Sequence, residues 1–457
     1  MAILHCRIIC LIVLTILQAS QCAKSQSFIG INYGESADNL PPPSVAVKLL
    51  QSTSIAKVRL YGADAAIIRA LANSGICIMI GAANGEIASL NDPTAAKQWI
   101  NTNVLPYYPA SKIVAISVGN EVLTSNDQNL ISQIIPAMQN LHTALLGASL
   151  ADKIKVTTVH SMAVLSQSAP PSSGRFNPDL QVLKQVLGFL HDTGAPFTIN
   201  PYPYFAYQSD PRPETLAFCL FQQNAGRFDP ATKITYYNMF DAQMDAIYSA
   251  LAAQGFGDME VVNAETGWAY EGDPNEVGAN LENAKAYNGN LIKHLRSRVG
   301  TPLRPNTSPD TYIFALFDED LKGGPSSERH FGLYKPDLSM TYDIGLEKGT
   351  QVNPSPSVNP SPSAGKAGTW CMPKAGVSES DLQANLDYAC GQGIDCSALQ
   401  PGGACFLPNT VVAHAAYAMN LLYQTSARNP WNCDFKQTAI LTSTNPSYQG
   451  CSFAGGT

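Results

Sequence analysis

The chain has 457 residues, of which 45% are apolar and 14% charged, and its formal net charge is −7. This length suffices for one large core and a smaller second unit. The acidic balance and the scattered basic residues exclude a nucleic-acid-binding surface built on a basic patch, so we expect no nucleic-acid partner and favour a neutral ligand.

Residues 1–25 have the composition of a secretory signal peptide. Arg7 precedes the ten-residue apolar run IICLIVLTIL, which is too short to span a membrane comfortably, and small residues follow in QASQCAKS. We expect cleavage after Ser25, although Cys22 and Ala23 also fit. No second apolar span follows, and CSFAGGT at the end lacks a hydrophobic tail. The sequence therefore predicts an exported protein without a transmembrane segment or a lipid anchor signal.

Short β-rich runs alternate with longer helix-compatible segments between residues 26 and 348. The eight predicted strands are 28–34, 56–62, 76–83, 112–121, 153–160, 196–204, 259–266 and 311–319. Many of these runs are continuously apolar, as expected for parallel strands covered on both faces. Eight βα units predict an α/β fold, a closed (β/α)₈ TIM barrel. An open doubly wound sheet is the competing architecture, but no glycine-rich phosphate loop supports it.

A proline-rich linker follows the long domain. Residues 349–368 contain VNPSPS twice in tandem, and proline at this density favours an extended, semi-rigid chain. The remaining residues, 369–457, form a small second domain, in which we predict a helix with a capping box at Ser378 and Asp381 and a second helix capped by Asn409. This domain contains six cysteines, at 371, 390, 396, 405, 433 and 451. In an exported chain that density predicts a disulfide framework, for which fifteen pairings are possible.

Two glutamates end predicted strands of the long domain. Glu121 follows SVGN at the end of the fourth strand, and Glu265 lies within VVNAETGWAY at the end of the seventh. Active sites of such barrels lie at the C-terminal ends of the strands, so both carboxylates should face one mouth. Two facing carboxylates are what glycosidic cleavage needs, although a single strand-end glutamate would as readily cap a helix or pair with a surface cation. The residues alone do not say which glutamate has which role.

Polar and aromatic residues accompany both acids. Asn120 can hydrogen-bond a sugar hydroxyl, and Trp268 offers a flat face to a pyranose ring, although it could equally be a core residue. The tyrosines of NPYPYFAY, at 200–207, either line the cleft or pack a rigid loop. On the predicted eighth loop we expect substrate contact from three charged residues, Glu319, Lys322 and Glu328.

Other chemistries fit less well. The seven histidines are dispersed without a His-x-x-x-His pair, so we expect no metal, and we expect no cofactor. AISVG lacks the leading glycine of a nucleophile elbow. Cys77 lies inside an apolar run and is expected to be a core residue and not a nucleophile.

The motifs GINYG, VGNEV, NPYPYFAY, ETGW and FALFDEDLKGGPSSERHFGLY resemble, in this order, the plant endo-1,3-β-glucanases of glycoside hydrolase family 17. The resemblance covers the whole long domain and implies a (β/α)₈ barrel that hydrolyses β-1,3-glucan, such as callose or a fungal wall glucan, with retention of configuration. It implies that Glu265 is the nucleophile and Glu121 the general acid/base. Retention requires the two carboxyl groups to lie about 5–5.5 Å apart.

The same resemblance supplies further site residues. The residues that it places along the cleft are Tyr33, Asn120, Tyr202 and Trp268. The charged set on the eighth loop, Glu319, Lys322 and Glu328, is expected to orient the substrate or the catalytic acids. One departure is GWAY, where the family usually has GWPS; it leaves Glu265 in place and the subsite preference open.

The second domain, from TWCMPK to WNCDF, resembles the six-cysteine family 43 carbohydrate-binding module, whose members bind β-1,3-glucan. The disulfides that this resemblance implies are Cys371–Cys433, Cys390–Cys451 and Cys396–Cys405. Tyr388, Tyr417 and Trp431 are candidates for stacking on the sugar, and each is equally a candidate for the core.

The sequence and these resemblances predict a secreted, monomeric endo-1,3-β-glucanase of the cell wall or apoplast, with a role in plant defence if fungal glucan is its substrate. NTS at 306–308 makes Asn306 a predicted N-glycosylation site. Two alternatives stay open. One is a wall glucan-binding protein with a weak or inactive barrel, and the other is a transglycosylase in which a sugar hydroxyl replaces water.

Overall fold

The computed structural model describes residues 28–348, 369–374, 377–392, 394–425, 430–433, 435, 438–442, 445–448 and 451–455. The predicted signal peptide and linker lie outside these residues. The chain divides into two compact units, Met1–Val352 and Asn353–Thr457. Among the described helices, none combines the length and apolar character that crossing a membrane requires.

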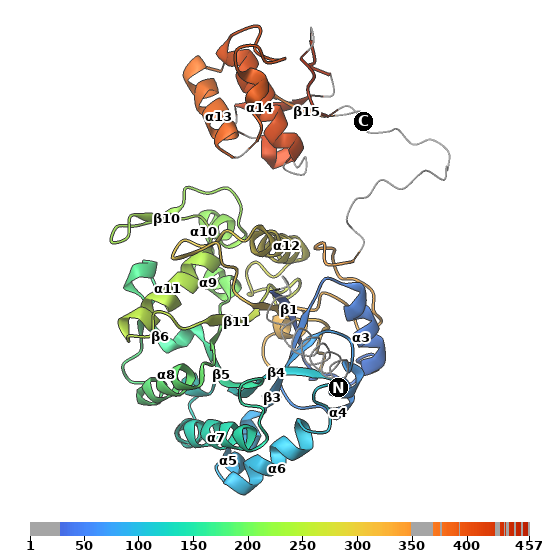
Figure 1. Ribbon diagram of the computed structural model, residues 1–457, viewed down its shortest axis with the longest axis vertical. Helices are drawn as coiled ribbons and strands as arrows, with labels where there is room; N and C mark the ends of the chain where they lie inside the picture. Colours follow the sequence, from blue (N-terminus) through green and yellow to red (C-terminus); the bar gives the residue numbers. More distant parts are fainter. Residues whose placement is uncertain are drawn as a thin grey trace, which may run out of the picture. The chain divides into compact units, whose positions relative to one another are not determined.

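The first unit is a closed barrel of eight parallel strands (Figure 1). In chain order they are β1 (Ile29–Tyr33), β2 (Lys57–Leu60), β3 (Cys77–Ala82), β4 (Lys112–Asn120), β5 (Lys155–Ser161), β8 (Phe197–Asn200), β11 (Val261–Thr266) and β14 (Thr311–Ile313). The pairing of β1 with both β2 and β14 closes the ring. Each strand overlaps one of the eight predicted runs, and the predicted (β/α)₈ fold is confirmed.

Helices surround the ring of strands (Figure 1). They are α3 (Pro43–Ser52), α4 (Ala65–Ala70), α5 (Ile87–Leu90), α6 (Pro93–Asn103), α7 (Gln128–Gly147), α8 (Gln181–Thr193), α9 (Pro203–Ser209), α10 (Pro213–Cys219), α11 (Met239–Ala253) and α12 (Leu281–Ser297). The longest ones begin at side chains that accept a backbone N–H of the first turn: Asp127 for α7, Asn238 for α11 and Asn280 for α12. Short hairpins, β6 (Leu165–Gln167) with β7 (Arg175–Phe176), β9 (Arg227–Asp229) with β10 (Ile234–Tyr236), and β12 (Gly300–Thr301) with β13 (Arg304–Pro305), occupy the connections.

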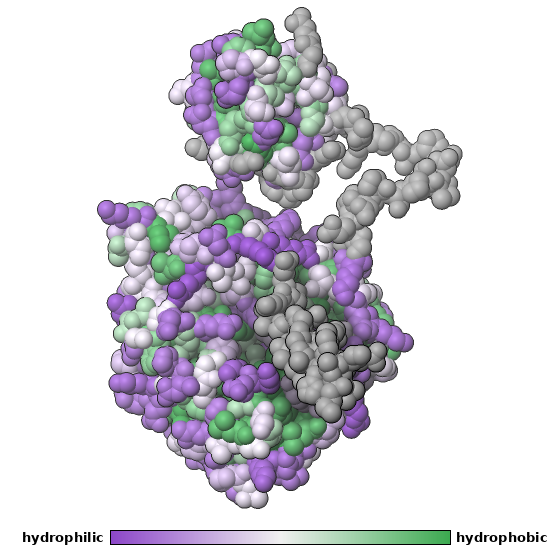
Figure 2. Space-filling model, viewed as in Figure 1, coloured by the Kyte–Doolittle hydropathy of each residue, from purple (hydrophilic) through white to green (hydrophobic). Residues whose placement is uncertain are grey.

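The strands are buried on both faces, which explains their continuously apolar sequences. Most apolar strand residues pack outward against the helices in one large core. A separate small cluster joins Met79, Ala115, Val262 and Tyr312, which come from strands on opposite sides of the ring and therefore fill its interior. On the face drawn in Figure 2, hydrophilic and apolar residues are interspersed over the outside of this unit.

The described residues of the second unit include two α-helices and a two-stranded antiparallel sheet. Its elements are β15 (Trp370–Pro373), α13 (Glu379–Gly391), α14 (Val411–Thr425) and β16 (Ala439–Thr442). The predicted cap of the first helix is present, because the Ser378 hydroxyl accepts the Asp381 N–H. At the second helix the prediction is wrong: Thr410, one residue after Asn409, accepts the N–H of Ala413.

Two of the three predicted disulfides are wrong. The structure contains Cys371–Cys433, as expected, but in place of Cys390–Cys451 and Cys396–Cys405 it contains Cys390–Cys396 and Cys405–Cys451. Cys390 lies in the last turn of α13, and the chain turns back there, so that its Cα lies 5.9 Å from that of Cys396, six residues later. The Cα atoms of Cys405 and Cys451 are 4.7 Å apart. The local turn at the end of α13 therefore places Cys390 next to Cys396 and away from its predicted partner, Cys451.

Candidate active site

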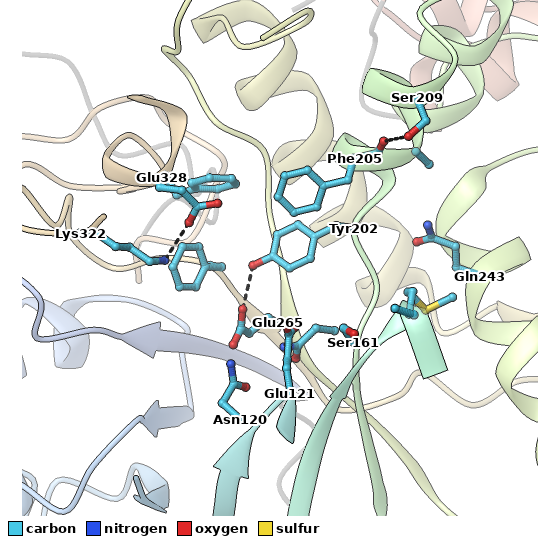
Figure 3. Close-up of a pocket in the computed structure, with 16 residues that line it drawn as sticks. Asn120, Glu121, Ser161, Tyr202, Phe205, Ser209, Gln243, Glu265, Lys322 and Glu328 are labelled. Carbon is cyan, nitrogen blue, oxygen red and sulfur yellow. Dashed lines mark hydrogen bonds and ion pairs between the residues drawn. The ribbon is translucent and has the colours of Figure 1, made fainter. Parts of the chain in front are cut away.

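A cavity of about 590 Å³ opens at the C-terminal ends of the barrel strands (Figure 3). Its lining includes six of the residues that the sequence predicted for the site: Asn120, Glu121, Tyr202, Glu265, Lys322 and Glu328. The elements that carry them are the ends of β4, β8 and β11 and the loop after β14. Parallel strands bring these positions together, because the barrel aligns all their C-terminal ends at one mouth.

Glu265, near the end of β11, is held by two donors. Arg59 Nη1 lies 2.7 Å from its Oε1, and the Tyr202 hydroxyl donates to its Oε2 at 3.0 Å. The carboxylate side chain is 9% exposed and the Arg59 side chain 1%, so this ion pair is buried. A buried carboxylate needs such a partner, and two donors on its two oxygens fix its orientation.

Arg59 is itself fixed by its surroundings. Besides Glu265, its guanidinium donates to the Ala264 carbonyl at 3.1 Å and to Asn120 Oδ1 at 2.7 Å. Its Cζ lies 4.5 Å from the centroid of the Tyr61 ring. Arg59 therefore joins β2, β4 and β11 across the floor of the cavity, and it determines where Glu265 points.

Glu121 is presented by an unusual backbone conformation directly after β4. Its φ is 57°, and its N–H donates to the Val159 carbonyl of the neighbouring β5 at 2.8 Å. Its Oε1 accepts a hydrogen bond of 2.8 Å from Asn200 Nδ2. Burial, and next the negative charge of Glu265, raise the pKa of Glu121 above its usual value, whereas the Asn200 hydrogen bond lowers it.

The two glutamates thus share one cavity floor in different electrostatic environments (Figure 3). Glu265 faces a buried cation, and Glu121 is exposed to the field of Glu265. Such a pair can supply one carboxylate as a nucleophile and one carboxylic acid as a proton donor.

Trp268 does not line the cavity, contrary to the prediction. Its side chain is fully buried, with its N–H donating to the Gly278 carbonyl at 2.8 Å. The ring packs against Tyr204 edge-on at 5.2 Å and against Tyr207 at 6.0 Å. The Trp268 indole has both a hydrogen-bond partner and apolar neighbours beneath the loop after β11. Trp268 is therefore a core residue, the alternative that the sequence left open.

Tyr33 and Glu319 are also displaced from their predicted places along the cavity. Tyr33 is 1% exposed and packs edge-on against Phe317. Glu319 is 5% exposed, lies against Gly34 and accepts the Ser36 N–H at 3.0 Å. It ties the loop after β1 to the loop after β14, and burial raises its pKa.

Lys322 and Glu328 lie together on one wall of the cavity (Figure 3). Their side chains form an ion pair of 3.2 Å, and Lys322 Nζ lies 4.1 Å from the centroid of the Phe314 ring. The positive and negative charges offset one another, so this wall offers hydrogen-bonding groups without a large net charge.

The sequence interpretation missed several lining and supporting residues. Arg59 could have been found, because a charged residue inside the apolar strand KVRLYG requires a buried partner. Asn200, at the end of β8, carried the same strand-end signal as the glutamates. Nothing in the sequence distinguishes the aromatic lining residues Phe205, Phe314 and Phe331 from core residues.

The described residues contain no group of three or more His, Cys, Asp or Glu side chains placed to hold a metal ion. Cys77 is buried within β3, and the thiol of Cys219 is buried against the Pro203 carbonyl. Neither cysteine lines the cavity; the titratable side chains among its lining residues are Glu121, Tyr202, Glu265, Lys322 and Glu328.

Family models match both units of the chain. Residues 29–346 match the glycosyl hydrolases family 17, and residues 369–440 match the X8 domain. Among curated relatives, glucan endo-1,3-beta-glucosidase 7 of Arabidopsis thaliana is 64% identical over 94% of this chain and 85% of its own length. A glucan endo-1,3-beta-D-glucosidase of Olea europaea is 60% identical over 97% of both chains.

A solved structure resembles the barrel unit. The β-1,3-glucanase and allergen CJP38 of Cryptomeria japonica pollen superimposes with a TM-score of 0.67 at 41% identity, covering 70% of this chain and 99% of its own. The chain in that structure therefore corresponds in length to the first unit alone.

Proposed function

The chain belongs to glycosyl hydrolase family 17 and carries an X8 domain, and we propose that it is a secreted endo-1,3-β-glucanase with a retaining double-displacement mechanism. The observation that carries this proposal is the pair of unequal glutamates on one cavity floor: Glu265 bound by a buried arginine, and Glu121 with a raised pKa. Curated relatives at 60–64% identity bear the name of the same activity.

In the first step, Glu121 protonates the glycosidic oxygen while a Glu265 oxygen attacks the anomeric carbon. Arg59 and Tyr202 hold the attacking carboxylate in place, so little reorganisation is needed at the moment of reaction. The aglycone chain departs with the proton, and the glycosyl residue stays bound to Glu265 as an ester.

In the second step, Glu121 acts as a base. Formation of the ester removes the negative charge of Glu265, which was one cause of the raised pKa of Glu121. The pKa of Glu121 therefore falls, and its carboxylate accepts a proton from the water that attacks the anomeric carbon. Water enters on the face opposite to Glu265, so two inversions give net retention.

The cavity suits a neutral polysaccharide. Aromatic rings of Tyr202, Phe205, Phe314 and Phe331 line it together with amide and hydroxyl groups. Aromatic faces pack against the C–H faces of pyranose rings, and the polar groups bind hydroxyls. The ion-paired Lys322 and Glu328 add donors and acceptors to one wall.

The second unit is proposed to hold the same glucan, so that the linker keeps the polymer near the barrel at a high effective concentration. Tyr388 is 57% exposed and forms a T-shaped contact with Phe435, so more than half of its side chain is open to a sugar ring. Tyr417 is half-buried and packs edge-on against Phe453 at the edge of the core of this unit. The Trp431 side chain lies outside the described residues.

The remaining proposals concern the protein's setting. We infer that the protein is exported to the cell wall or apoplast as a monomer. Asn306, the predicted N-glycosylation site, is exposed in the turn after β13, where it is accessible for glycosylation.

The deciding experiment compares the intact protein with Glu265→Gln on laminarin, a soluble β-1,3-glucan. We expect the intact protein to release shortened chains whose new reducing ends are first β-anomers, and the variant to lose at least about 10³-fold in kcat, because the amide is a poor nucleophile. Full activity in the variant would refute the role of Glu265. Binding without cleavage by the intact protein would refute the proposed function and favour a glucan-binding protein.

A further inference from the structure

The cavity extends to both sides of the catalytic glutamates, and its two sides differ in chemistry (Figure 3). One side carries the ion pair of Lys322 and Glu328. The other side is formed by the segment after β5, by α9 and by α11, and the described residues that line it include no charged side chain. We call it the Gln243 flank and define it as Ser161, Met162, Ala163, Phe205, Ser209 and Gln243.

The strand order places the Gln243 flank beside Glu121. Glu121 follows β4, which pairs with β5, and β5 ends at Ser161. The hydroxyls of Thr124 and Ser161 lie 2.9 Å apart and connect the two strand ends. Glu265, near the end of β11, lies between β8 and β14, with which β11 pairs, so it borders α9 on one side and the loop of Lys322 on the other. Because a general acid protonates the leaving oxygen, the departing chain extends from the side of Glu121.

The Gln243 side chain has an unsatisfied polar atom at this flank. Gln243 lies in the second turn of α11, and its carboxamide lines the cavity. Its Oε1 is buried and has no hydrogen-bond partner among the described residues. A buried acceptor without a partner costs free energy, which a hydrogen bond from a ligand would recover.

The rest of the flank fits an uncharged, amphipathic ring. Phe205 is 41% exposed, and with Met162 it offers apolar surface to the C–H face of a pyranose. The Ser161 hydroxyl and the Gln243 carboxamide offer polar groups beside it. No charged side chain of the flank would favour an anionic sugar.

We propose that the Gln243 flank binds the glucose units on the leaving side of the scissile bond and that Gln243 is a specificity-determining residue there. This inference rests on the proposed function. The flank also holds an acceptor chain once the leaving portion has departed. The acceptor hydroxyl oxygen then bonds to the anomeric carbon, the ester bond to Glu265 breaks, and the hydroxyl proton passes to Glu121.

The test uses two substrates that differ only on the leaving side. Cleavage of laminarihexaose releases a shorter sugar chain from the leaving side. Cleavage of the aryl bond of a 4-nitrophenyl laminarioligoside releases 4-nitrophenol, which has no sugar hydroxyls. In Gln243→Leu we expect the ratio of kcat/KM for the hexaose to kcat/KM for the aryl substrate to fall about tenfold, the effect of one lost hydrogen bond. Gln254→Leu, at the exposed end of the same helix, is the matched control, and its ratio should equal that of the intact protein.

A second readout follows the partition between water and sugar acceptors. At high laminarihexaose concentration, the proportion of products longer than the substrate should fall in Gln243→Leu and also in Gln243→Ala, which has no amide and does not fill the cavity. An unchanged ratio and unchanged product partition in both variants would overturn the inference. Equal losses on both substrates would also overturn it, since they would indicate a structural role. Failure of the intact protein to cleave laminarin would instead overturn the proposed function.

Discussion

Asn200 and Arg59 give the two glutamates that we propose as catalytic residues different chemical environments. Arg59 donates to Glu265 from a fully buried guanidinium, whereas Asn200 offers Glu121 a neutral amide. An amide stabilises a carboxylate less than a cation does, so Glu121 remains under the influence of burial and of the Glu265 charge. Two identical side chains thereby differ in the way that the proposed roles of nucleophile and acid require.

The pH dependence of catalysis should respond to Asn200. As the general acid, Glu121 must be protonated in the free enzyme, so kcat/KM falls as pH rises through its folded-state pKa. The hydrogen bond from Asn200 lowers this pKa, so Asn200→Ala should raise it and move the alkaline limb of the kcat/KM profile to higher pH. The measurement is laminarin hydrolysis between about pH 3 and pH 9. A limb that moves to lower pH would contradict the role of Glu121 as the acid.

At the scale of single residues, the sequence was informative where chemistry coincides with a strand end. Glu121, Glu265 and Asn120 follow directly from their positions after apolar runs. Trp268 could not be placed in the same way, because an indole ring can stack on a sugar in a cleft or pack against apolar residues in a core. Its burial depends on the carbonyl of Gly278, ten residues later, which no local pattern indicates.

At the scale of elements, strands were predictable and the loops between them were not. Parallel strands covered on both faces must be apolar along their whole length, so the eight runs in the sequence mark them. The loops after β1 and β14 meet in space although about 280 residues separate them, as the hydrogen bond from the Ser36 N–H to Glu319 illustrates. Glu319 was expected in the cavity from its place after the eighth strand. The contact with the loop after β1 holds it beneath the two loops instead.

The meeting of these two loops leaves no room for a side chain at Gly34. A Cβ atom there would lie 2.2 Å from Glu319 Oε1, so Gly34→Ala should displace the Glu319 carboxyl and destabilise the fold by about 1–3 kcal/mol. Thermal unfolding should show a lower Tm, and kcat/KM on laminarin should fall as the loop of Lys322 shifts. Gly62→Ala is the matched control after β2, where an added Cβ meets nothing within 4 Å. Equal Tm values for both variants would show that the two loops are not constrained at Gly34.

The disulfides show the same limit for small elements. Six cysteines within the second unit predict a framework, but pairing depends on how α13 ends. The turn after Gly391 brings Cys396 back to Cys390, and Cys405 is then left for Cys451. Which cysteines pair therefore follows from the fold of the unit and not from the spacing of the cysteines in the sequence.

At the scale of the whole molecule, catalysis and polymer capture are assigned to separate units. The barrel contains both proposed catalytic glutamates, and all the lining residues of the cavity lie between Asn120 and Phe331. A β-1,3-glucanase that corresponds to this unit alone is known as a solved structure. The second unit has its own buried clusters and disulfides and presents Tyr388 to solvent. Each unit can therefore be tested for its own contribution.

Removal of residues 353–457 should separate the two contributions. On soluble laminarin, kcat/KM should stay within about twofold of the intact protein, because no residue of the cavity is lost. On insoluble β-1,3-glucan particles, the rate at low substrate loading should fall about tenfold or more, since the barrel then loses the effective concentration that a second binding unit provides.

Tyr388→Ala in the full chain should reproduce part of this loss, whereas Ile440→Ala, which removes another exposed apolar side chain of the same unit, should not. If the truncated protein lost activity equally on soluble and insoluble glucan, the second unit would be supporting the barrel and not holding the polymer. If it lost activity on neither, glucan capture by this unit would be refuted.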